Sequence, residues 1–151
     1  MKIQWDNGLN TGNQVVDSQH QELFKRVGLL IDACRQDMPG EAVWAMVNFT
    51  EQYMVEHFAT EEKLIRQYDV PDAEAHFAEH REFCALVGRI KKLFAIRGAD
   101  YSLAIDTIST IAGWVGSHIH GRDKALCRFI HEQEEISKQQ PAIVHPLNLS
   151  D

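Results

Sequence analysis

Two pairs of side chains that bind metals or transfer protons stand four positions apart in this sequence. His57 and Glu61 form one pair in the segment HFATEE, and His76 and His80 form the other in HFAEH. Residues four apart lie on one face of an α-helix, so each pair would point in a single direction. Imidazole nitrogens and carboxylate oxygens are ligands for transition metals. One HxxxH pair among eight histidines is weak support by itself, because solvated surface histidines explain it equally well.

Helices are the elements that must position these pairs. Apolar residues recur at helical spacing, and no strand-like alternation occurs. Asp17 or Ser18 is expected to cap the first helix, Pro71 to open the third and Gly98 to close it. The four expected helices cover residues 18–36, 41–67, 71–97 and about 100 to at least 130.

Short connections between four long helices predict an all-α fold, an up-down-up-down antiparallel four-helix bundle. Residues 1–16 are expected to form an irregular N-terminal arm. We expect one bundle domain over residues 1–131 and a C-terminal tail over residues 132–151, where prolines interrupt the pattern.

The bundle topology would bring the histidines to one level. Residues near the starts of the first and third helices lie at the same end of such a bundle as residues late in the second and fourth. Surface histidines placed at random have no reason to share this level. The residues expected at this common level are His20, His57, Glu61, His76, His80, His118 and Asp123.

Five imidazoles and two carboxylates inside a bundle need an electrostatic reason to be there. Buried carboxylates and imidazolium groups are costly without partners, and a metal removes that cost by binding the deprotonated side chains. Seven ligands are too many for one tetrahedral zinc ion. They suit two six-coordinate ions that share bridging carboxylates.

Four segments carry a recognisable order and spacing of these residues. They are Trp5…Gly12…Asp17-x-x-His20, 57-HFATEE-62, 70-VPDAEAHFAEH-80 and 114-WVGSHIHGRD-123. Together they resemble the bacterial hemerythrins of the hemerythrin family, over about residues 3–131.

This resemblance implies a non-haem di-iron site with an oxo or hydroxo bridge. It implies that Glu61 and Asp123 bridge two iron ions, and that one iron has one histidine fewer, which leaves a position open for dioxygen. The histidines implied for the first iron are His76, His80 and His118, and those for the second are His20 and His57.

The choice between His118 and His120 sets geometry against resemblance. His118 and Asp123 are five apart, about 140° around a regular helix, whereas His120 and Asp123 face each other better. The resemblance selects His118. We therefore expect a one-residue π-bulge between His118 and Asp123, helped by Gly121, and a solvated or supporting role for His120.

Trp114 and Val115 are the candidates for lining a dioxygen pocket, although core packing explains most aromatic residues near the ligands. Val115 is small, and a loose pocket would admit water and speed loss of bound oxygen by autoxidation.

The Glu-x-x-His motif of ferritin-like di-iron enzymes is absent, because no glutamate stands three residues before any histidine.

The expected function is reversible dioxygen binding for storage, delivery or sensing, without enzymatic activity. The alternative is an enzyme that reduces peroxide or nitric oxide at the same site. Expected partners are dioxygen and, for delivery or sensing, an oxygenase or a signalling protein.

Composition excludes other classes of partner. A net charge of −7 argues against nucleic acid and anionic membranes, and no apolar run is long enough to span a bilayer. The N-terminus lacks the apolar core of a signal peptide, and three cysteines without a CxxC motif fit a reducing compartment. We therefore expect a cytoplasmic protein.

Overall fold

The fold is helical throughout the part of the chain that the computed structural model describes, residues 5–36, 39–98 and 100–139. Those residues contain no strand, so the predicted all-α class is confirmed. The elements are the 3₁₀ turn η1 (Asn7–Leu9), α1 (Gln14–Arg35), α2 (Pro39–Tyr68), α3 (Ala73–Arg97), α4 (Tyr101–His118), the π-helix η2 (Ile119–Asp123) and α5 (Lys124–Gln139).

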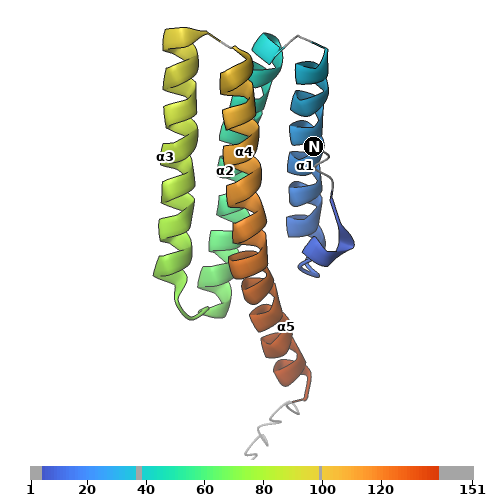
Figure 1. Cartoon of the computed structure of the whole chain (residues 1–151). Coiled ribbons are helices and arrows are strands. Elements are labelled where there is room, and N and C mark those ends of the chain that lie inside the picture. Colours follow the sequence, from blue (N-terminus) through green and yellow to red (C-terminus); the bar gives the residue numbers. More distant parts are fainter. Residues whose placement is uncertain (1–4, 37–38, 99, 140–151) are drawn as a thin grey trace, which may run out of the picture.

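Helices α1 to α4 run alternately up and down, as predicted (Figure 1). Both α1 and α3 pack against α2 and α4. Helix α4 continues through η2 into α5, and α5 extends past the end of the bundle (Figure 1). The starts of α1 and α3 therefore lie at the same end of the bundle as the finish of α2 and the π-helix η2. None of the described helices is both long and apolar enough to cross a membrane.

The first helix begins earlier than predicted. Asn13, and not Asp17 or Ser18, is its N-cap, because the Asn13 side chain accepts hydrogen bonds from the first backbone N–H groups of α1. Val16 is completely buried and extends the core face of the helix by one turn. The Asp17 carboxylate instead accepts hydrogen bonds from the backbone N–H and the hydroxyl of Thr11, which ties the irregular arm to α1.

The start of α3 differs from the prediction, whereas its end and the start of α4 agree with it. Pro71 lies in a turn and does not open α3, because Asp72 adopts a left-handed conformation (φ 57°) that a helix cannot include, so the helix begins at Ala73. Gly98 closes α3 as predicted, at φ 71°. Asp100 caps α4 through a hydrogen bond from a backbone N–H of its first turn, in agreement with the expected start of this helix near residue 100.

Helix α5 is longer than the sequence indicated. Residues 132–139, placed in the expected tail, continue the helix, and the Tyr68 hydroxyl donates a 2.6 Å hydrogen bond to the Glu134 carboxylate. Residues 140–151 of the expected tail lie outside the described residues. The proposed division of the chain at residue 131 stays a prediction.

The hydrophobic core has two parts. The larger cluster fills the bundle between α1, α2, α3 and α4, and includes the completely buried Leu23 and Phe83. The smaller cluster joins α2 to α5 through Ile65, Leu126 and Ile130. Leu23 follows His20 by three positions, whereas Ile65 follows Glu61 by four. The predicted metal ligands thus occupy a polar layer between two apolar clusters, which hold the helices on either side of it.

Candidate metal centre

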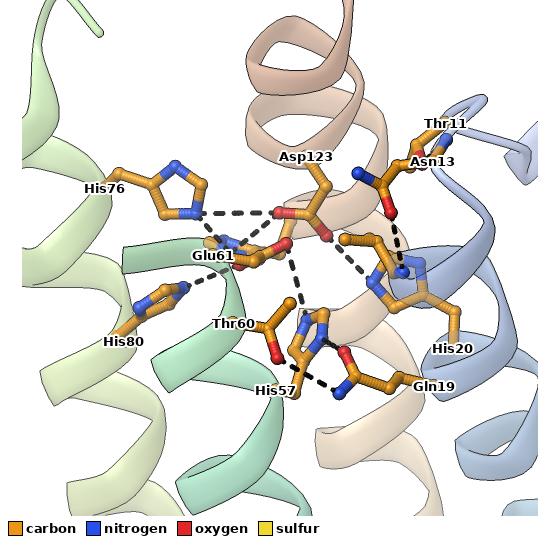
Figure 2. A network of polar contacts seen from close by, with 12 residues as sticks. Thr11, Asn13, Gln19, His20, His57, Thr60, Glu61, His76, His80 and Asp123 are labelled. Carbon is orange, nitrogen blue, oxygen red and sulfur yellow. Dashed lines mark hydrogen bonds and ion pairs between the residues drawn. The ribbon is translucent and has the colours of Figure 1, made fainter. Parts of the chain in front are cut away.

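The structure brings all seven predicted ligand side chains together, from α1, α2, α3 and the end of α4 with η2. Each is at most 5% exposed, and the two carboxylates are completely buried. Figure 2 shows the side chains from α1, α2 and α3 converging on the carboxylates. The ligand atoms form two groups that share one glutamate, and within each group all atoms lie within 4.8 Å of one another. The groups are Glu61 with His76, His80 and His118, and Glu61 and Asp123 with His20 and His57.

In the first group, called here the three-histidine group, the Nε2 atoms point at shared carboxylate oxygens. Glu61 Oε2 lies 3.2 Å from His76 Nε2 and 3.1 Å from His80 Nε2. His118 Nε2 lies 3.1 Å from Asp123 Oδ1 and 3.9 Å from Glu61 Oε2. Three imidazoles from two different helices therefore surround one small space.

In the second group, called here the two-histidine group, the other oxygen of each carboxylate is used. His57 Nε2 lies 3.5 Å from Glu61 Oε1, and His20 Nε2 lies 3.1 Å from Asp123 Oδ2. Each carboxylate thus turns one oxygen to each group. This is the arrangement of two bridging carboxylates between neighbouring cations.

Several of these atoms approach each other without hydrogen bonding. Both oxygens of Asp123, Oε1 of Glu61 and the Nε2 atoms of His20 and His118 are buried without a hydrogen-bond partner. Buried polar atoms are rarely left so, and a group of them requires an explanation such as an ion. Metal–nitrogen and metal–oxygen bonds of about 2.1 Å would place neighbouring ligand atoms about 3 Å apart and opposite ones about 4 Å apart. The observed separations of 3.1–3.9 Å fit this range.

The pKa values of the two carboxylates are shifted in opposite directions. Burial raises the pKa of Asp123, and the nearby charge of Glu61 raises it further. Burial also acts to raise the pKa of Glu61, but His57 and the three imidazoles that contact it outweigh this and hold its pKa well below the usual value. Two negative charges in one buried space oppose each other, so the site favours a bound cation that compensates both.

The pKa values of two of the histidines, His57 and His118, are also shifted in opposite directions. Burial lowers the pKa of His57 to about 3, which keeps its imidazole neutral and its lone pair free for a metal. Burial also acts to lower the pKa of His118, but its contacts with Glu61, Asp123 and Glu79 raise it above the usual value.

The predicted π-bulge is present and accounts for the five-residue spacing. Residues Ile119–Asp123 form a π-helix, which inserts one extra residue and turns Asp123 to the same side as His118. Ile119 is buried and His120 is exposed, which favours the first of the two roles expected for His120, solvated rather than supporting. A Cβ atom at Gly121 would meet nothing within 4 Å, so the bulge does not need glycine for space.

Aromatic rings enclose the three-histidine group. Trp114 stacks on His118 with ring centroids 4.2 Å apart and on Phe83 at 4.1 Å. Phe58 stacks on His80 at 3.8 Å. These rings fix the imidazoles and keep water away from them.

Val115 faces the other side of α4. It lines a small apolar cavity of about 10 Å³ together with Ala112 and with residues of α1 that follow His20 by three to seven positions, namely Leu23, Phe24 and Val27. Trp114 therefore lies beside the three-histidine group. Val115 instead lies on the side of α4 that faces α1, the helix that carries His20.

Sequence reasoning missed the residues that support the ligands. Glu79 accepts a 2.8 Å hydrogen bond from His118 Nδ1, and Gln19 accepts one of 3.0 Å from His57 Nδ1. Their only signal in the sequence is that each directly precedes a ligand histidine. Each supports a histidine of another helix, so the packing of the helices was needed to find them.

Comparison with known proteins points to one family. The family model described as hemerythrin HHE cation binding domain matches residues 11–130. A bacteriohemerythrin of Stenotrophomonas maltophilia is 30% identical over 121 residues, which cover 80% of this chain and 76% of that protein. A bacteriohemerythrin of Pseudomonas paraeruginosa is 27% identical over 137 residues, 90% of this chain and 87% of that one. A myohemerythrin of Riftia pachyptila is 31% identical over 120 residues, 79% of this chain and 86% of that one.

The shared carboxylate gives the most direct test of the site. We expect Glu61→Gln to lower the bound metal from two ions per chain to one or none, because both groups lose an anionic ligand. Glu56→Gln, on the exposed face of the same helix, should leave two. Metal would be counted by elemental analysis after loading and desalting. Two ions retained by Glu61→Gln, with circular dichroism showing a folded helical protein, would refute a bridging role.

The π-helix gives a second prediction. Gly121→Ala should keep the metal content and leave stability unchanged or raised by up to about 1 kcal/mol, because alanine favours helical backbone and meets open space here. The measurements are metal content and urea unfolding of the metal-free protein. Loss of metal in this variant would show that the bulge depends on glycine after all.

Proposed function

This chain belongs to the hemerythrin family, and on that premise we propose that it binds dioxygen reversibly at a pair of iron ions, for storage, delivery or sensing. The observation that carries the proposal is the unequal division of five imidazoles about one shared glutamate. Six-coordinate ions bridged by Glu61 and Asp123 would be nearly saturated at the three-histidine group. The two-histidine group would keep a position for a small ligand.

The residues would hold two irons together with an oxo or hydroxo bridge. His76, His80 and His118 would bind one iron, and His20 and His57 the other, through Nε2 in each case. When bound, such a pair supplies electrons for reversible binding of dioxygen. The chain itself supplies neutral imidazoles, two carboxylates and the exclusion of bulk water, since every ligand is at most 5% exposed.

Placement favours Val115 over Trp114 as a wall of the dioxygen pocket. The open position is expected at the two-histidine group, and Val115 faces α1, which carries His20. Trp114 stacks on His118 of the other group, where packing and shielding of the ligand explain it. The apolar cavity beside Val115, of about 10 Å³, is at the lower limit for a single water molecule.

The ligand set also supports an alternative function, reduction of peroxide or nitric oxide at the same site. An oxygenase or a signalling protein as a delivery or sensing partner, and a cytoplasmic location, are further parts of the proposal.

An optical experiment tests the proposal. The iron-loaded protein, reduced without air, should gain a visible absorption band when oxygen is admitted and lose it when oxygen is removed, through repeated cycles. Irreversible bleaching in the first cycle, or steady consumption of peroxide or nitric oxide under reducing conditions, would favour the enzyme instead.

Val115 gives a separate prediction. Val115→Leu should fill the small cavity, exclude water better and slow autoxidation of the oxygenated protein several-fold. Val55→Leu, at a position 72% exposed on α2, is the matched control and should not change the rate. The decay of the visible band measures both. An unchanged or faster decay in Val115→Leu would count against its place in the pocket.

A further inference from the structure

The ligand histidines differ in what holds the ring nitrogen that faces away from the site. His118 Nδ1 donates a 2.8 Å hydrogen bond to one oxygen of Glu79. The other oxygen of Glu79 accepts a 2.6 Å hydrogen bond from Arg122 Nε, and the carboxylate is about one-third exposed. A charged group, itself fixed by an ion pair, therefore supports a histidine of the three-histidine group.

His57 of the two-histidine group is held by a neutral amide. Its Nδ1 lies 3.0 Å from Gln19 Oε1, and Gln19 Nε2 donates to the Thr60 hydroxyl oxygen at 3.3 Å (Figure 2). The Thr60 hydroxyl in turn donates to the backbone carbonyl of Glu56 at 2.8 Å. Because that hydrogen is already used, Gln19 must turn its NH₂ to Thr60 and its oxygen to His57.

This chain of hydrogen bonds fixes the tautomer of His57. An amide oxygen can only accept, so His57 Nδ1 must carry the hydrogen. The lone pair is then on Nε2, the atom that lies 3.5 Å from Glu61 Oε1. Glu79 fixes His118 in the same tautomer, since a carboxylate also accepts.

The difference in charge extends to other ligands of the two groups. In the three-histidine group, His80 Nδ1 also lies 3.5 Å from a carboxylate oxygen, that of Glu62. In the two-histidine group, His20 Nδ1 is buried and has no hydrogen-bond partner among the described residues. Carboxylates thus support the first group from outside, and an amide supports the second.

We propose that Glu79 and Gln19 are positioning residues that make the two metal positions unequal. A carboxylate partner makes an imidazole a more basic ligand than an amide partner does. The three-histidine group therefore binds its metal first and more tightly, whereas the two-histidine group binds second and stays the more exchangeable. This inference rests on the ligand assignment of the proposed function, but not on dioxygen binding.

The test is a titration of the metal-free protein with cobalt(II), followed by visible absorption and by the shifted proton resonances of the ligand rings. Wild type should fill in two steps, the first at His118 and the second at His57. Glu79→Gln, which keeps an acceptor but removes the charge, should weaken the first step by about 10-fold, the lower end of the usual effect of changing an outer partner of a ligand. Gln19→Leu should weaken only the second step by about 10–100-fold. Gln19→Glu, which keeps the acceptor and adds charge, should strengthen it.

Matched controls are Glu82→Gln on α3 and Gln21→Leu on α1, both exposed in the structure and expected to titrate as wild type. Circular dichroism of each metal-free variant checks folding, and Gln19→Glu, nearly the same size as wild type, provides a test if Gln19→Leu does not fold. Unchanged affinities in Glu79→Gln and Gln19→Leu, or equal weakening of both steps in either, would overturn the inference. A wild type that fills in two steps, but whose iron form does not bind oxygen reversibly, would support it and reject only the proposed function.

Discussion

Two carboxylates buried at the centre of a helical bundle are the constraint on which the rest of this structure depends. Glu61 and Asp123 are both 0% exposed, and no lysine or arginine contacts either among the described ion pairs. The groups that face them are five imidazoles. Burying two negative charges this way is unfavourable unless cations compensate them. The fold therefore makes sense with metal ions bound, in agreement with the matched family model, which is described as a cation binding domain.

This constraint explains features that helix packing alone does not. A regular helix would turn Asp123 away from His118, and the π-helix at Ile119–Asp123 restores its direction. The polar layer separates two apolar clusters, one filling the bundle and one joining α2 to α5. Helix α5 packs against α2 on the far side of the layer. Hydrophobic burial on both sides of the layer holds the helices together although the two carboxylates repel each other.

The environment of the site is as unequal as its ligand set. Carboxylates face the outer nitrogens of His80 and His118 in the three-histidine group, whereas an amide faces that of His57 in the two-histidine group. One group of ligands is thus supported by charge from outside, and the other by a neutral amide. In the carrier function proposed above, both ions would stay bound and only the one with fewer histidines would receive and release dioxygen.

The sequence by itself determined the helices, their alternating directions and the seven candidate ligands, because helical periodicity and residue spacing are local and place His57 beside Glu61 and His76 beside His80 without any tertiary contact. The family resemblance, which selected His118 over His120, also predicted the π-bulge, since five-residue spacing on a regular helix does not bring His118 and Asp123 together. Only the fold decided which of several possible residues begins each helix. Helix α1 begins at Gln14, so that Val16 is buried, and α3 begins after Asp72, whose backbone is left-handed. Only tertiary structure showed that Gln19 supports a histidine of α2 and Glu79 one of α4. Such contacts depend on the rotation of one helix against another, which packing of whole faces sets and no single segment encodes.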